Sequence, residues 1–164
     1  MKKIMEMLQN MKAKNEKKDN KGFSLVELII VIAIMAILVG IVGTQVLPYI
    51  NKSKEAKDFQ IINSYGTAAT TAYASLAEKV TKDTTVDVYN PAADADGQPA
   101  TTLSTEIKKL TGYNTIGNLT AKMGSDKGSD IDKIEIKFDL TNKKIITQAY
   151  KGTDKVFEQV VTEL

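Results

Sequence analysis

A nearly unbroken apolar run from Leu25 to Gly43 is the strongest pattern in the chain, and Glu27 is its one charged residue. At about 1.5 Å of rise per residue, a helix of this length covers the roughly 30 Å hydrocarbon core of a bilayer. The run is longer than the apolar part of an ordinary secretory signal, and no A-x-A-like cleavage site follows it. It therefore predicts a membrane-spanning helix that the mature chain keeps.

A helical pattern continues beyond this run, because apolar or small residues recur at alternating steps of three and four. The stripe consists of Phe59, Ile62, Gly66, Ala69, Tyr73, Leu76 and Val80. We expect one helix from about Ser24 to about Lys79, bent near Pro48, whose second half packs this stripe on a small globular domain. A two-stranded coiled coil is disfavoured, because the stripe is short and contains two small residues.

The remaining sequence predicts an α+β fold. Residues 81–101 are rich in Thr, Asp, Ala and Pro and predict an irregular loop, whereas residues 102–112 predict a short helix that ends at Gly112. Glycine and serine residues indicate a second loop at 124–129. Within 131–162, apolar and polar residues alternate in three runs separated by turn residues, which indicates an antiparallel sheet of about three strands. The long helix should cover the apolar face of this sheet.

Charge is distributed unevenly along the chain. Residues 1–22 contain seven lysines and three acidic residues, a charge of +4, so with a whole-chain charge of +2 the remainder carries −2. Positive flanks of a membrane span stay in the cytoplasm, which places residues 49–164 outside. The mildly acidic remainder gives no argument for nucleic-acid binding.

The chain contains no cysteine, histidine or tryptophan. This composition excludes disulfides, thiolate metal sites, cysteine nucleophiles and histidine acid–base chemistry, so catalysis is unsupported and neither a catalytic residue nor a cofactor is predicted. Two acidic loops resemble fragments of calcium sites, one around Asp94 and Asp96 and one around Asp126, Asp130 and Asp132. Neither has the glutamate that an EF-hand requires, and solvated turns are the favoured interpretation.

Residues 22–47 read GFSLVELIIVIAIMAILVGIVGTQVL and resemble the class III signal of type IV pilins and their pseudopilin relatives. The resemblance implies that a membrane peptidase cuts between Gly22 and Phe23, removing residues 1–22 as a leader, and that Phe23 is then N-methylated. It also implies a role for Glu27, whose carboxylate would pair with the Phe23 amine of an adjacent subunit.

The resemblance implies a division of the chain as well. Residues 23–48 would form the half of the helix that lies in the membrane and later in a filament core. Residues 49–164 would form the globular head, which begins with the amphipathic half of the helix at 49–80. Family members usually carry a proline about one turn earlier than Pro48 and often a C-terminal cysteine pair, which this chain lacks. Another device must therefore close the end of the sheet.

Glu27 and the segment that precedes Pro48 each admit two interpretations. An ionisable group in an apolar span is costly, which favours a partner for Glu27, but a place near the helix start lowers that cost. The alternative is a tolerated glutamate at the membrane interface of an ordinary anchor. The segment Gly40–Pro48 either loosens on assembly, since glycine and proline weaken a helix, or packs closely at Gly40 and Gly43.

The leading hypothesis is a structural subunit of a type IV pilus, held in the membrane as a precursor and assembled into an extracellular filament for adhesion, motility or biofilm formation. Its partners would be copies of itself, the prepilin peptidase and N-methyltransferase, the assembly platform and minor pilins. The first alternative is a pseudopilin of a secretion or DNA-uptake system. The second is a membrane-anchored enzyme or binding domain, which would keep its leader.

Overall fold

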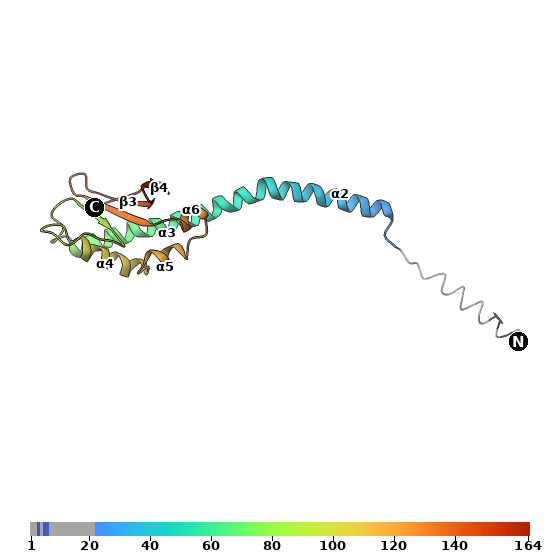
Figure 1. The fold of residues 1–164 in the computed structure, drawn as a ribbon, viewed down its shortest axis with the longest axis horizontal. Coiled ribbons are helices and arrows are strands. Elements are labelled where there is room, and N and C mark those ends of the chain that lie inside the picture. Colours follow the sequence, from blue (N-terminus) through green and yellow to red (C-terminus); the bar gives the residue numbers. More distant parts are fainter. Residues whose placement is uncertain (1–2, 4, 7–21) are drawn as a thin grey trace. The chain divides into compact units, whose positions relative to one another are not determined.

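The computed structural model describes residues 3, 5–6 and 22–164, so most of the predicted leader lies outside the described residues. The chain divides into two compact units, Met1–Val46 and Leu47–Leu164. Figure 1 shows the helical segments α2 and α3 and the sheet and short helices that follow them along the chain.

The chain is helical without a break from Leu25 to Leu76, which confirms the predicted long helix. Its parts are α2 (Leu25–Ile41), the π-helical turn η1 (Val42–Val46) and α3 (Leu47–Leu76). The π turn ends two residues before Pro48, which has no N–H for the carbonyl of Thr44 and whose ring would crowd that carbonyl in a regular α-helix. The wider turn relieves this conflict. An irregular turn thus lies within the segment that the sequence marks as weak.

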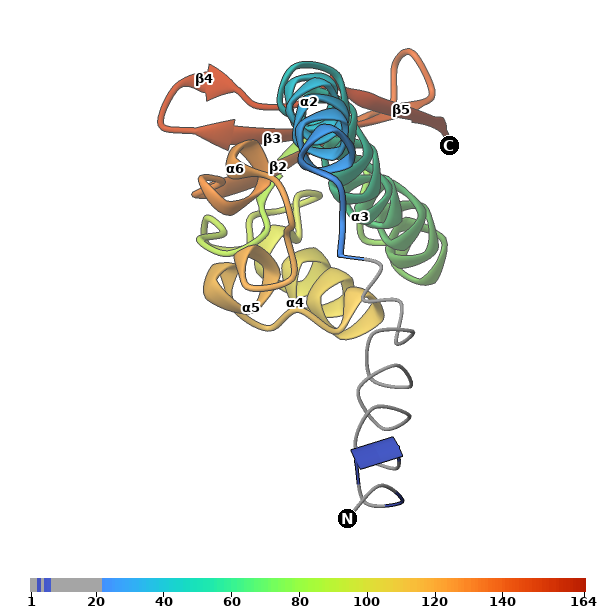
Figure 2. The ribbon, with the colours of Figure 1, turned by 90° about the vertical axis from the view of Figure 1, so that its right-hand side faces the viewer.

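The buried face of α3 is wider than the predicted stripe. Of that stripe, Ile62, Gly66 and Ala69 are buried on α3, and Val80 is buried beyond its end. Tyr65 and Ala68 lie outside the stripe and are buried too. The reason is that α3 contacts both the sheet, through β3 (Lys144–Lys151) and β5 (Val160–Glu163), and the helix α4 (Ala100–Thr111), as Figure 2 shows. The head is therefore built around α3 from two sides.

The sheet is antiparallel throughout, with the order β1-β2-β3-β4 and with β5 also paired to β3. Its strands are β1 (Thr84–Asp87), β2 (Lys133–Asp139), β3 (Lys144–Lys151), β4 (Asp154–Lys155) and β5 (Val160–Glu163). The first two predicted strands are confirmed as β2 and β3. Along β2 the buried residues alternate as expected: Ile134, Ile136 and Phe138.

Two predictions about the sheet are wrong. Residues 81–101 are not a loop throughout, because they contain β1, whose TTVD sequence offers only four residues of weak alternation. The third predicted strand, residues 156–161, is displaced: β4 lies before it in the predicted turn, and β5 overlaps only its last two residues. Between them Gln148 Nε2 donates to Phe157 O at 2.8 Å, so a side chain takes the place of a ladder bond there. The sheet consequently has five strands instead of about three.

The predicted short helix is confirmed as α4, and Gly112 follows it in the left-handed conformation with φ of 78°. Asp94 supplies the cap at its start by accepting the Thr101 N–H at 2.6 Å and the Thr102 hydroxyl at 2.8 Å. These bonds, led by the one from Thr102, lower the pKa of Asp94. Two short helices follow, α5 (Ile116–Thr120) and α6 (Asp126–Ser129). The helix α6 stands where the sequence predicts a loop.

A buried carboxylate joins α3 to the segment before α6. Asp58 is 2% exposed and accepts hydrogen bonds from the backbone N–H groups of Gly124 and Ser125, both at 2.8 Å, and from the Ser125 hydroxyl. The same hydroxyl oxygen caps α6 by accepting the N–H of Gly128 at 3.0 Å. Because its carboxyl group accepts three hydrogen bonds from Gly124 and Ser125, Asp58 is a fixed link between segments 66 residues apart.

Noncovalent contacts close the C-terminal end of the sheet. The strand β5 pairs with β3, and the N–H of Leu164 continues the pairing with a bond of 3.0 Å. The hydroxyls of Thr70 on α3 and Thr162 on β5 hydrogen-bond at 3.2 Å. A Cβ on Gly66 would lie only 3.0 Å from Val160 Cγ1, so glycine lets α3 and β5 approach closely. These contacts hold the end of the sheet without a cysteine pair.

Replacing the Asp58 carboxylate should destabilise the head. Asp58→Ala should lower its free energy of unfolding by about 2–4 kcal/mol, because the N–H groups of Gly124 and Ser125 lose their acceptor. The matched control is Glu55→Ala, which removes a 2.9 Å ion pair with Lys127 between the same two segments and should cost less than about 1 kcal/mol. Urea unfolding of the full chain in detergent, followed by tyrosine near-ultraviolet circular dichroism, measures both. Equal losses would contradict the link.

Candidate functional site

The segment that carries the predicted cleavage site precedes α2 and is not helical. Gly22, Phe23 and Ser24 lie outside the helix, which begins at Leu25, and Phe23 is 84% exposed. No described atom comes within 4 Å of the place that a Cβ on Gly22 would take, and its φ is not left-handed. The described structure of the chain therefore does not itself require glycine at this position.

A capping box starts α2. The hydroxyl oxygen of Ser24 accepts the N–H of Val26 at 3.3 Å and also that of Glu27, while Glu27 Oε2 accepts the N–H of Ser24 at 2.8 Å. The first regular helical bond runs from the N–H of Leu28 to Ser24 O at 3.1 Å. These bonds satisfy N–H groups that the end of a helix otherwise leaves unpaired. The Glu27 carboxylate also lies at the positive end of the helix dipole.

The structure thus brings Glu27 to Ser24 within one chain. The predicted pair between Glu27 and the Phe23 amine of another subunit stays a prediction. Ser24 is the functional candidate that the sequence analysis missed. Its signal was present, because a serine followed three residues later by glutamate, directly before an apolar run, is typical of a capping box.

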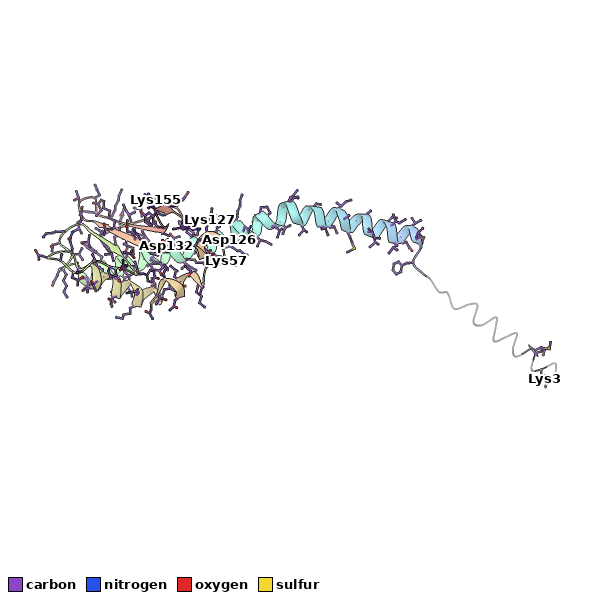
Figure 3. The ribbon with its side chains drawn as sticks, viewed as in Figure 1. Lys3, Lys57, Asp126, Lys127, Asp132 and Lys155 are labelled. Atoms are coloured by element: carbon purple, nitrogen blue, oxygen red, sulfur yellow. The ribbon has the colours of Figure 1, made fainter. Side chains whose placement is uncertain are left out.

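The apolar surface of α2 is uncovered by the rest of the described chain. Every residue from Gly22 to Lys54 is exposed, and Figure 3 shows side chains projecting all along this helix. Among the described residues, the helix that contains α2 is the one long and apolar enough to cross a membrane. A Cβ on Gly40 or Gly43 would meet no described atom within 4 Å, so packing inside the chain explains neither glycine. A surface of this kind indicates burial in lipid or against other chains.

The acidic loops contribute to local structure. Asp130 forms a 2.6 Å ion pair with Lys151, which raises the pKa of that lysine, and Asp132 Oδ2 accepts the N–H of Gly152 at 2.6 Å. Within residues 3, 5–6 and 22–164, no three acidic, histidine or cysteine side chains are grouped so that they could hold a metal ion. The calcium resemblance therefore gains no support from the geometry.

Residues 17–43 match a family model described as the prokaryotic N-terminal methylation motif. The chain carries the class III signal of type IV pilins and pseudopilins. This finding confirms the resemblance noted for residues 22–47, and the matched segment contains Gly22, Phe23 and Glu27. Neither the curated proteins nor the solved structures gave a match.

The rest of the chain agrees with the pilin-like signal in layout. A long N-terminal helix continues into a head with an antiparallel sheet, which is the α+β arrangement of a pilin-like protein. The methylation motif is the place at which a prepilin peptidase cuts pilins and pseudopilins, and together with the apolar helix it fits a membrane-anchored precursor.

Proposed function

We propose that the chain is the precursor of a type IV pilus subunit, which is cut between Gly22 and Phe23, N-methylated at Phe23 and assembled into an extracellular filament. The observation that carries this proposal is that the methylation motif, residues 17–43, includes the fully exposed apolar helix α2. The filament would serve adhesion, motility or biofilm formation. Its partners would be copies of the chain, the prepilin peptidase and methyltransferase, an assembly platform and minor pilins.

The exposed surface of α2 supports assembly through this helix. In the membrane its apolar side chains would face lipid, and in a filament the same side chains would face the helices of neighbouring subunits. Such a transfer keeps the apolar surface out of water throughout. Gly40 and Gly43 would let neighbouring backbones approach closely, since small residues permit close helix packing.

The Glu27 carboxylate would set the register between subunits. Cleavage creates an amine on Phe23, and the Glu27 of a neighbouring subunit would pair with it in the dry filament core. One carboxylate can accept several hydrogen bonds, so the bond from Ser24 to Oε2 leaves capacity for this partner. Pairing would neutralise both charges as they leave water, and a mispaired register would leave a buried charge uncompensated.

The intact mass of protein extracted from the cell surface tests the proposal. The chain should begin at Phe23 and carry one additional methyl group, and sheared surface filaments should contain it as an abundant subunit. A processed chain that is absent from sheared filaments would instead support a pseudopilin of a secretion or DNA-uptake system. A chain that keeps residues 1–22 would overturn the proposal in favour of a membrane-anchored enzyme or binding domain.

Changes at Gly22 should act on cleavage alone. Gly22→Ala should slow cleavage by about tenfold and Gly22→Leu should block it, because a small residue must fit beside the scissile bond in the peptidase. Since the described chain leaves space at Gly22, the loss would report on the peptidase and not on folding. Gly40→Ala is the control and should be cut normally. Immunoblots of precursor and mature bands measure all three, and normal cleavage of Gly22→Leu would contradict the assignment of the site.

Removing the charge of Glu27 should separate processing from assembly. In Glu27→Gln the amide oxygen can still accept the Ser24 N–H, so cleavage should continue. Filament yield should collapse, because an unpaired amine in the core costs about 3–5 kcal/mol per contact. Glu78→Gln, at an exposed glutamate beyond α3, is the control. Sheared-filament yield and the precursor-to-mature ratio are the measurements, and a normal yield from Glu27→Gln would refute the pairing role.

A further inference from the structure

The hydrogen bonds at the start of α2 determine whether the peptide bond between Gly22 and Phe23, the proposed cleavage site, is part of the helix. In an α-helix each N–H bonds to the carbonyl four residues earlier, and in α2 this ladder begins with Leu28 N–H to Ser24 O. The next two donors toward the N-terminus belong to Glu27 and Val26. Their helical acceptors would be the carbonyls of Phe23 and Gly22. The Gly22 carbonyl is part of the peptide bond between Gly22 and Phe23.

The Ser24 hydroxyl takes both of these donors. Its oxygen accepts the N–H of Val26 and that of Glu27, so neither reaches back to the residues before the helix. The Ser24 N–H, which in a longer helix would also bond four residues back, is held by Glu27 Oε2. The capping box thus replaces three of the bonds that would carry the helix back over the scissile peptide, those of the Ser24, Val26 and Glu27 N–H groups, and Ser24 itself is extended, with φ −62° and ψ 143°.

An extended peptide suits hydrolysis better than a helical one. Hydrolysis adds one water across the Gly22–Phe23 amide, breaks its C–N bond and leaves a carboxylate on Gly22 and an amine on Phe23. A peptidase must reach the carbonyl carbon and bind the carbonyl oxygen as negative charge develops on it. In a helix that oxygen already accepts a bond from the turn that follows. Here Gly22 and Phe23 are exposed and precede the helix.

We infer that Ser24 is a positioning residue for processing: together with Glu27 it caps α2 and holds the Gly22–Phe23 peptide extended and accessible to the peptidase. The inference rests on the proposed function, because it presupposes the cut at this bond. In this role Ser24 acts through the backbone. Phe23 and Ser24 then separate the cleaved bond from Leu25, the first residue of the helix.

The experiment compares full-length precursors in detergent, incubated with a prepilin peptidase and followed by intact mass. Ser24→Thr and Ser24→Val form the matched pair, because they have nearly the same shape and differ in the hydroxyl that caps the helix. Cleavage of the Val variant should be slower by about fivefold, equivalent to about 1 kcal/mol, the usual worth of an N-cap. The Thr variant and Ser24→Asn, which also caps, should be cut at the wild-type rate.

A second measurement separates capping from direct contact with the peptidase. The carbonyl ¹³C chemical shift of Gly22 in labelled precursor should move toward the helical value in Ser24→Val and stay at the extended value in Ser24→Thr. Slow cleavage of Ser24→Asn, or an extended Gly22 in a slowly cut Ser24→Val, would overturn the capping role.

The outcomes for the two proposals can be told apart. Equal cleavage rates for wild type, Ser24→Thr and Ser24→Val would overturn the role of Ser24 while leaving the proposed processing intact. Failure of the peptidase to cut the wild-type precursor would overturn the proposed function, and the role of Ser24 would fall with it.

Discussion

The constraint on which the rest depends is the uncovered apolar surface of α2. Every side chain from Leu25 to Ile41 is exposed, and the head has its own separate core. In lipid, each unpaired backbone group at the end of such a helix costs several kcal/mol. The start of α2 meets this cost locally, because Ser24 and Glu27 satisfy one another's backbone N–H groups. The apolar helix α2 therefore depends on the capping box at its start.

The head packs around the helix α3 and is stabilised without a disulfide bond. Its links are polar groups that are satisfied in place. Asp58 holds the segment before α6, and the Tyr65 hydroxyl hydrogen-bonds that of Tyr89 inside the core. Burial, with a smaller effect of Tyr89, raises the pKa of Tyr65, so this hydroxyl stays neutral. Close approach at Gly66 seats β5 against α3. A domain fixed in this way can do without cysteine.

Local patterns were sufficient where the periodicity was long and were insufficient where a contact joined distant residues. The alternation of Ile134, Ile136 and Phe138 is long enough to predict β2, and the glycine after α4 predicts its end. The strand β1 was missed because its alternation covers only four residues, within a segment whose Asp, Ala and Pro content is typical of a loop. Nothing near Asp58 in the sequence shows that its carboxylate meets backbone donors 66 residues away. The cap at Ser24, by contrast, is local and could have been recognised from its spacing.

The capping box explains the place of Glu27 but not its charge. A glutamine at the third helical position completes a capping box as well as a glutamate does, and a neutral amide enters an apolar environment at lower cost. The helix dipole favours the carboxylate by only about 0.3–1 kcal/mol. A charge in an apolar span costs up to about 2.5–3.5 kcal/mol at the centre and less near the end, so the dipole offsets part of the cost at most. A glutamate at this position is therefore best explained by a second partner of opposite charge, and the proposed cleavage after Gly22 would supply one in each copy of the chain.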